Sequence, residues 1–267
     1  MGSLFDELKA SITEARPVAL VTVIKGAERG AKLLVTDDGS QGSLGNADLD
    51  FAVVEDLTHM LQLGVTGIRS YGPTGRRRLD DVQVFIESFT PPPRMYVFGA
   101  IDFTGAVTRV GKLLGYHVTV CDAREKFATR ERFPEADEVV VMWPDEFLAD
   151  ASVDRRTVIC ALTHDPKFDV PLLKAALATD AGYIGAMGSR RTHDERVAQL
   201  RDEGVSDEDI ARVAGPIGLD IGARTPGEVA VSIAAEVIAL RSDASGRRLV
   251  DLDGPVHAPG SVASEGS

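Results

Sequence analysis

Eleven residues in the second half of this 267-residue chain are candidates for ligand chemistry, because each follows closely on a short apolar run. They are Gly99, Asp102, Asp122, Arg124, Thr163, His164, Asp165, Gly188, Ser189, Arg190 and Arg191. If the apolar runs are parallel strands, their carboxyl ends meet at one edge of a sheet, where open α/β sheets bind their ligands. We therefore expect these residues to form one cofactor-binding site.

The segment Gly188-Ser189-Arg190-Arg191 precedes a predicted helix. Glycine lets the backbone approach a ligand closely, and a helix N-terminus and guanidinium groups attract anions. The segment predicts a phosphate site. The alternative is a solvated helix cap with ordinary surface arginines.

A hydroxyl, an imidazole and a carboxylate follow one another at Thr163, His164 and Asp165. Such a trio at the end of a buried strand can hold a ligand or orient a proton transfer. Because no nucleophile, base and orienting group surround it, we assign no catalytic residue. The alternative is a structural histidine.

The first strand-to-helix turn bears on nicotinamide binding. Of the G-x-G-x-x-G pattern of dinucleotide-binding folds only Gly99 is present, and Asp102 places a negative charge where a pyrophosphate would lie. Asp122 follows about 20 residues later, where an acid takes the ribose hydroxyls; the alternative is an ion pair with Arg124. NAD(P) is therefore less favoured than another phosphate-bearing cofactor.

Alternating strands and helices must position these residues. Predicted strands at residues 96–99, 118–121, 139–142, 157–162 and 183–187 alternate with helices at 103–114, near 145, at 170–178 and at 192–203. Almost wholly apolar strands that alternate with helices predict a parallel sheet covered on both faces. A last helix begins after Thr225, with Pro226 and Glu228 completing a capping box.

The first part of the chain has a different pattern. A leading helix is followed by predicted strands at residues 18–24, 31–36 and 82–89 and a helix at 48–63. Residues 70–78 are turn-rich and basic, and we interpret Arg76, Arg77 and Arg78 as a solvated turn. The predicted fold is α/β, with a small N-terminal α/β domain and a C-terminal Rossmann-like domain with a parallel sheet.

The domain boundary is predicted at Pro91-Pro92-Pro93, which favours a stiff extended linker. The expected domains are residues 1–90, a linker at 91–94, a Rossmann-like domain at 95–241 and a disordered tail at 242–267 that is rich in glycine, serine and alanine.

Composition excludes several classes of function. The net charge of −12 argues against nucleic acid as a partner. The two cysteines, Cys121 and Cys160, lie in apolar runs, which predicts buried thiols in a reducing compartment. With no signal-peptide pattern and no apolar stretch of the ~20 residues that span a bilayer, we expect a cytoplasmic protein with no membrane contact. No residue spacing suggests a bound metal.

Several longer motifs carry a family resemblance. Besides the three prolines they are residues 162–165 (LTHD), 183–191 (YIGAMGSRR), 216–223 (PIGLDIGA) and 225–233 (TPGEVAVSI). On these motifs the chain resembles the xanthine dehydrogenase accessory protein family of the XdhC/CoxI type over most of its length.

The resemblance implies a protein that matures molybdenum hydroxylases. Such proteins are similar in having a small N-terminal domain and a Rossmann-like domain, and are often homodimers. They bind molybdenum cofactor, as molybdopterin or its dinucleotide form, and deliver it sulfurated to an apo molybdenum hydroxylase, with a cysteine desulfurase as a further implied partner.

The chain departs from the family pattern at two places. Asp48 stands where the family has a cysteine, and a carboxylate cannot carry sulfur. The first strand turn reads Gly99-Ala100-Ile101-Asp102 where the family has glycine-x-glycine-histidine. The leading hypothesis remains a cofactor maturation factor. The alternatives are an NAD(P)-dependent oxidoreductase and a nucleotide-binding regulatory module on the same fold.

Overall fold

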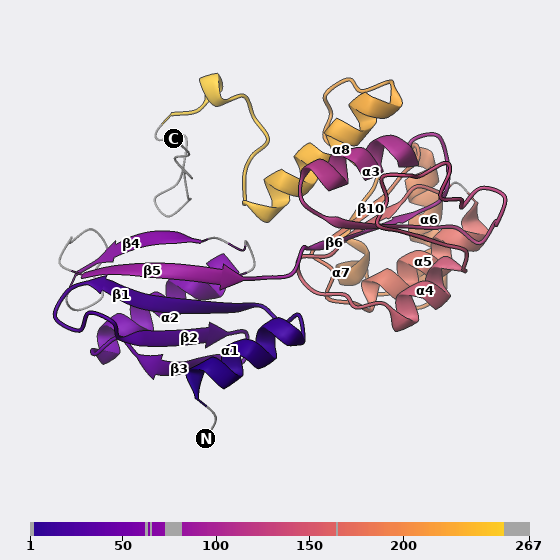
Figure 1. Ribbon diagram of the computed structural model, residues 1–267. Helices are drawn as coiled ribbons and strands as arrows, with labels where there is room; N and C mark the ends of the chain where they lie inside the picture. Colours follow the sequence, from indigo (N-terminus) through magenta and orange to yellow (C-terminus); the bar gives the residue numbers. More distant parts are fainter. Residues whose placement is uncertain (1–2, 62–63, 65, 73–81, 164, 254–267) are drawn as a thin grey trace. The chain divides into compact units, whose positions relative to one another are not determined.

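The computed structural model describes residues 3–61, 64, 66–72, 82–163 and 165–253 of the chain (Figure 1). The chain divides into two compact units, the first ending at Pro91 and the second spanning Pro92–Asp253. The predicted basic turn at Arg76–Arg78, His164 and the tail from residue 254 lie outside the described residues.

The first unit is an antiparallel sheet with helices. Its elements are α1 (Leu4–Thr13), β1 (Val18–Lys25), β2 (Lys32–Thr36), β3 (Gly39–Ser43), α2 (Ala47–Met60), β4 (Gly67–Tyr71) and β5 (Val82–Phe89). Within the described residues the strand order is β3-β2-β1-β5-β4. Apolar residues of β1, β2 and β5 bury against Leu49, Val53 and Leu57 of α2.

Two edge strands of this unit were not predicted. β3 has the sequence GSQGS and β4 the sequence GIRSY, and neither carries an apolar run. Both are held by backbone pairing, β3 to β2 and β4 to β5. Edge strands need little burial, so the hydrophobic pattern does not mark them.

The second unit is a parallel sheet covered on both faces, which confirms the predicted Rossmann-like fold. Its elements are β6 (Arg94–Phe98), α3 (Thr104–Leu113), β7 (His117–Cys121), β8 (Glu138–Val140), α4 (Pro144–Asp150), β9 (Val158–Ala161), α5 (Pro166–Leu177), β10 (Tyr183–Ala186), α6 (Arg190–Asp202), α7 (Asp207–Ile210), β11 (Val213–Ala214), α8 (Pro226–Arg241) and the 3₁₀ turn Leu249–Asp251.

The strand order of the described sheet is β11-β10-β9-β6-β7-β8, with every neighbouring pair parallel. The order reverses at β6, the first strand, which pairs with β7 on one side and β9 on the other. This junction is the switch point at which ligands bind in open α/β sheets.

Alternate residues of each strand face opposite helical layers. On β6, Met95 and Val97 belong to a core with residues of α3 and α8, whereas Tyr96 and Phe98 belong to a core with residues of α4, α5 and α6. In Figure 1, α3 and α8 lie together on one face of the sheet and α4 and α5 lie on the other. This two-sided burial explains why the strands are continuously apolar.

Two helices of this unit begin earlier than expected. α5 starts at Pro166 and not near residue 170, and α6 starts at Arg190 and not near 192. In each case the preceding side chain caps the helix, Asp165 for α5 and Ser189 for α6. None of the helices in the described part of the chain combines the length and apolar composition that a membrane crossing requires.

Candidate ligand-binding site

The loops after β6 and β9 meet at Gly99 and Thr163. Gly99 has a φ of +106°, and a Cβ there would lie 2.9 Å from Thr163 Cγ2 and 3.0 Å from its backbone nitrogen. Only glycine combines this backbone geometry with so close an approach. These two predicted site residues are therefore direct neighbours at the switch point.

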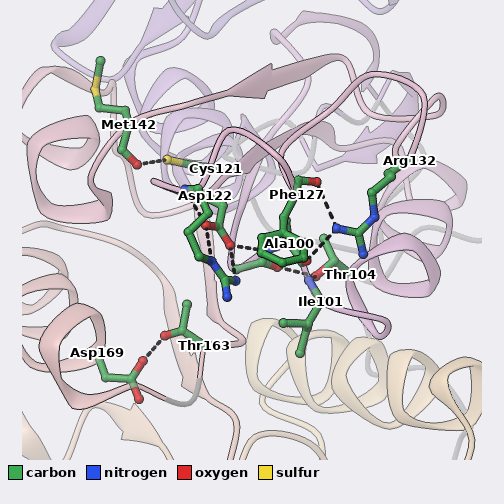
Figure 2. Close-up of polar contacts among 12 residues, drawn as sticks. Ala100, Ile101, Thr104, Cys121, Asp122, Phe127, Arg132, Met142, Thr163 and Asp169 are labelled. Atoms are coloured by element: carbon green, nitrogen blue, oxygen red, sulfur yellow. Dashed lines mark hydrogen bonds and ion pairs between the residues drawn. The ribbon is translucent and has the colours of Figure 1, made fainter.

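Asp122, at the end of β7, is buried and fully hydrogen-bonded. Its carboxylate accepts from the Ala100 N–H at 2.7 Å, the Arg124 N–H at 2.9 Å and the Arg124 Nε and Nη2 at 2.9 and 2.7 Å (Figure 2). A carboxylate has about four acceptor sites, so these four donors fill it. The ion-paired alternative is confirmed, and a ribose hydroxyl would have to displace one of these donors.

The pKa of Asp122 reflects these contacts. Burial by itself would raise the pKa of the carboxyl, but the Arg124 side chain and the N–H groups of Ala100 and Arg124 outweigh burial and hold the pKa below its ordinary value. Asp122 is thus a charged tie between the end of β7 and the turn after β6.

The first turn differs from a dinucleotide-binding turn in its closure. Thr104 stands at the position of the third glycine of that pattern and is fully buried. Its hydroxyl donates to the Gly99 carbonyl and accepts from the Ile101 N–H at 3.2 Å. The Ala100 N–H is already bonded to Asp122. Asp102 is exposed at the mouth of this turn.

The ends of β9 and β10 are joined by Arg196, which the sequence pattern did not predict. Arg196 of α6 is 3% exposed and donates to the Asp169 carboxylate at 2.8 Å, the Met187 carbonyl at 2.6 Å and the Thr163 carbonyl at 3.3 Å. The Thr163 hydroxyl also donates to Asp169 (Figure 2). The available signal was an arginine four residues before the buried Leu200, on the inward face of α6.

The predicted phosphate segment lies at the start of α6. Ser189 caps the helix by accepting from the Thr192 N–H at 3.1 Å. Arg191 pairs with Glu195 at 2.8 Å and its side chain is 89% exposed, and Arg190 is exposed as well. A Cβ at Gly188 would lie 3.0 Å from Arg196 Nη1, so this glycine leaves space for the buried arginine.

Asp165 is exposed and caps α5 by accepting from the Lys167 N–H at 3.1 Å. The structure thus links four strand ends in series. Asp122 ties β7 to the β6 turn, Gly99 touches Thr163 after β9, and Arg196 joins Thr163 to the end of β10. The resulting edge carries exposed polar groups on a base of buried, paired charges.

Neither cysteine of the chain is an exposed thiol. Cys121 and Cys160 are buried, and burial raises the pKa of each thiol to about 12. Asp48 is exposed in the first turn of α2. No group of three or more histidine, cysteine, aspartate or glutamate side chains in the described part of the chain is arranged to hold a metal ion.

Family descriptions match both units of the chain. The XdhC Rossmann domain matches residues 95–237, and the XdhC and CoxI family matches residues 11–72. The first range lies in the second unit and includes every predicted site residue.

Three curated relatives show similarity. YqeB of Escherichia coli (strain K12), an uncharacterized protein, is 29% identical over 81% of this chain and 41% of its own length. A probable xanthine dehydrogenase component of Bacillus subtilis (strain 168) is 27% identical over 59% of this chain and 46% of its own length. The molybdenum cofactor insertion chaperone PaoD of E. coli (strain K12) is 28% identical over 63% and 46%. The chain spans less than half the length of these relatives.

A solved structure shares the fold. The crystal structure of a protein from Bacillus halodurans, described as a xanthine dehydrogenase, superposes with a TM-score of 0.53 and covers 92% of this chain and 97% of its own, at 19% sequence identity. With its Rossmann domain matched from β6 to α8 and its first unit matched over residues 11–72, the chain belongs to the XdhC family.

Proposed function

We propose that this chain is an accessory factor that binds molybdenum cofactor and delivers it to a molybdenum hydroxylase of the xanthine dehydrogenase type. The observation that carries the proposal is the family membership together with the name of one relative, a molybdenum cofactor insertion chaperone. The cofactor is cargo in this proposal, bound and released unchanged.

The geometry of the sheet edge supports binding in the second unit. Gly188, Ser189, Arg190 and Arg191 take phosphate at the start of α6, where Arg190 contributes more than Arg191 because Glu195 already neutralises Arg191. Thr163, His164 and Asp165 contact the pterin or its metal end. Gly99 and Asp102 line the turn beside them.

Asp122 and Arg124 have a different part in the proposal. In a dinucleotide form of the cofactor they lie where a ribose binds. Because their donors and acceptors are paired with one another, the form without a nucleotide fits this structure better.

Sulfur reaches the cofactor from outside this chain in the proposed function. With both thiols buried and Asp48 at the family's cysteine position, the chain has no described thiolate that could carry sulfur. A cysteine desulfurase that acts on the bound cofactor would supply it, and a homodimer is the proposed assembly.

A nicotinamide-dependent oxidoreductase is the weaker interpretation of the same fold. The strand order suits a dinucleotide, but Thr104 closes the first turn, the Ala100 N–H is taken by Asp122, and Asp122 has no open acceptor for a ribose. Each of these would have to rearrange before NAD(P) could bind in the usual way.

Activation of a cofactor-free hydroxylase tests the proposed function. Apo-enzyme is mixed with molybdenum cofactor, with and without this chain, and its activity is followed with time. We expect faster or more complete activation with the chain, and less with Arg190→Ala/Arg191→Ala. Equal activation with and without the chain would contradict delivery, and unchanged cofactor affinity in the double variant would refute the phosphate assignment.

A further inference from the structure

An aromatic side chain stands open beside the first turn. Phe127 lies in the irregular segment between β7 and β8, and its side chain is 43% exposed. Its neighbours in this segment, Ala128 and Phe133, are buried. The segment is therefore anchored in the core while one ring is left accessible.

Two guanidinium groups contact this ring. The Cζ of Arg124 lies 4.6 Å from the Phe127 ring centroid and that of Arg132 lies 5.6 Å away. These are cation–π distances. Both arginines are held by further contacts, Arg124 by Asp122 and Arg132 by Phe133, whose centroid is 5.4 Å from its Cζ.

Arg132 fastens the ring to the site. One of its Nη atoms donates to the Ala100 carbonyl and to the Phe127 carbonyl, each at 3.1 Å. Figure 2 shows Phe127 and Arg132 beside the Ala100 turn. Both backbone polar groups of Ala100 are thus tied to the segment after β7, the N–H to Asp122 and the carbonyl to Arg132.

The charges of the two arginines differ. Arg124 is neutralised by Asp122, but no carboxylate in the described part of the chain pairs with Arg132, whose two hydrogen bonds go to neutral carbonyls. The ring therefore borders an exposed guanidinium with donors and a positive charge left over.

We propose that Phe127 and Arg132 form the recognition site for a flat heteroaromatic ring, with Phe127 stacking on its face and Arg132 donating to its nitrogen and oxygen acceptors. The inference rests on the proposed function for the source of that ring, the pterin of the cargo or the base of a nucleotide form. An aromatic face next to a guanidinium is the combination that binds such rings in proteins.

Substitutions at residue 127 separate stacking from packing. Phe127→Leu keeps an apolar side chain beneath the guanidiniums but removes the aromatic face, and Phe127→Trp enlarges that face. Leu113→Ala is the control, an exposed apolar residue of α3 in the same unit that is 84% exposed. Thermal unfolding of each variant verifies that it is folded.

The full chain is titrated with molybdenum cofactor released from a molybdenum hydroxylase and, separately, with nucleoside monophosphates. Affinity and quenching of the pterin fluorescence are measured. We expect Phe127→Leu to weaken binding roughly fivefold to a hundredfold, with loss of quenching, because stacking on an aromatic side chain contributes about that much. Phe127→Trp and Leu113→Ala should bind like the wild type, and Arg132→Gln should bind more weakly.

The outcomes distinguish the two proposals. Cofactor binding that is equal in wild type and Phe127→Leu overturns the stacking site and leaves the proposed function standing. Nucleotide binding that depends on Phe127, without cofactor binding, supports the stacking site and contradicts the proposed function. A wild-type chain that binds neither probe contradicts both.

Discussion

The residues that hold the candidate site together are not the ones that face solvent. Arg190, Arg191 and Asp165 are exposed, whereas Asp122, Asp169 and Arg196 are buried and join neighbouring strand ends. Buried charges are stable only when paired and hydrogen-bonded, and both pairs here meet that condition. The exposed groups are thus placed for contact with a ligand on a base formed by the buried ones.

Removal of Arg196 should destabilise the second unit strongly. Arg196→Met leaves the Asp169 carboxylate buried without its guanidinium, which costs about 3–5 kcal/mol. Urea denaturation measures the change in the free energy of unfolding. The matched control is Arg191→Ala, whose exposed pair with Glu195 should change it by less than about 1 kcal/mol. Equal small effects of the two variants would show that the buried pair does not organise this edge.

The Asp122 tie predicts a pH dependence. Its folded pKa lies below the ordinary 3.8, so the stability it contributes is complete above that pKa and is lost as the pH falls through the folded value. The free energy of unfolding should therefore differ between wild type and Asp122→Asn at pH 6, and the difference should shrink below about pH 4. Denaturation of both proteins from pH 7 to pH 3 measures it. A difference that is constant with pH would contradict the ion pair.

The thiols should be unreactive in the folded chain. Cys121 and Cys160 are buried and burial raises their pKa to about 12, so neither forms appreciable thiolate at neutral pH. A chromogenic disulfide reagent should label neither thiol within minutes in native buffer and both in denaturant. Rapid native labelling of one thiol would reopen the possibility that this chain carries sulfur.

Single residues set the limit of what could be predicted from the sequence. The strand ends were predictable because apolar runs mark them, and Gly99 and Thr163 do meet there. The Arg196 network was not, because it depends on which face of α6 points inward and on partners 27 and 33 residues away. The exposed Phe127 was missed because a ring in an irregular segment has no periodicity that marks it.

At the scale of elements, capping residues decide where the helices near the site begin. Asp165 and Ser189 are both candidate ligand contacts and N-caps, so each has its oxygen engaged with its own helix. The last helix, α8, has the most complete cap, with Thr225 and Glu228 bonded reciprocally. The sequence signal was strongest there, and the predicted helix is confirmed.

The cap of α8 predicts a measurable loss of stability. Thr225→Ala removes the oxygen that accepts from the Glu228 N–H and should lower the free energy of unfolding by about 1 kcal/mol. Thr225→Ser keeps the oxygen and should behave like the wild type. Urea denaturation of the three proteins compares them, and equal stability of the alanine and serine variants would mean that the cap contributes nothing.

Elements differed in how well the sequence predicted them. The buried strands β6, β7, β9 and β10 have dense apolar runs and were found, because a strand covered on both faces has no polar positions. The two-residue β11 escaped the pattern because it is too short to show one.

At the scale of the whole molecule, an anionic cargo meets a chain with a net charge of −12. Long-range attraction cannot bring the two together, so recognition must depend on local groups such as Arg190 and Arg132. Each of the two units has its own hydrophobic core, and each is matched by its own part of the XdhC family. The candidate ligand contacts lie in the second unit.

The most direct test of the central claim is an equilibrium titration of the purified chain with molybdenum cofactor released from a molybdenum hydroxylase, with NADH titrated in parallel. The account predicts saturable binding of the cofactor and none of NADH, because the first turn and Asp122 are closed to a dinucleotide. Saturable binding of NADH without binding of the cofactor would contradict the account and would favour an oxidoreductase on the same fold.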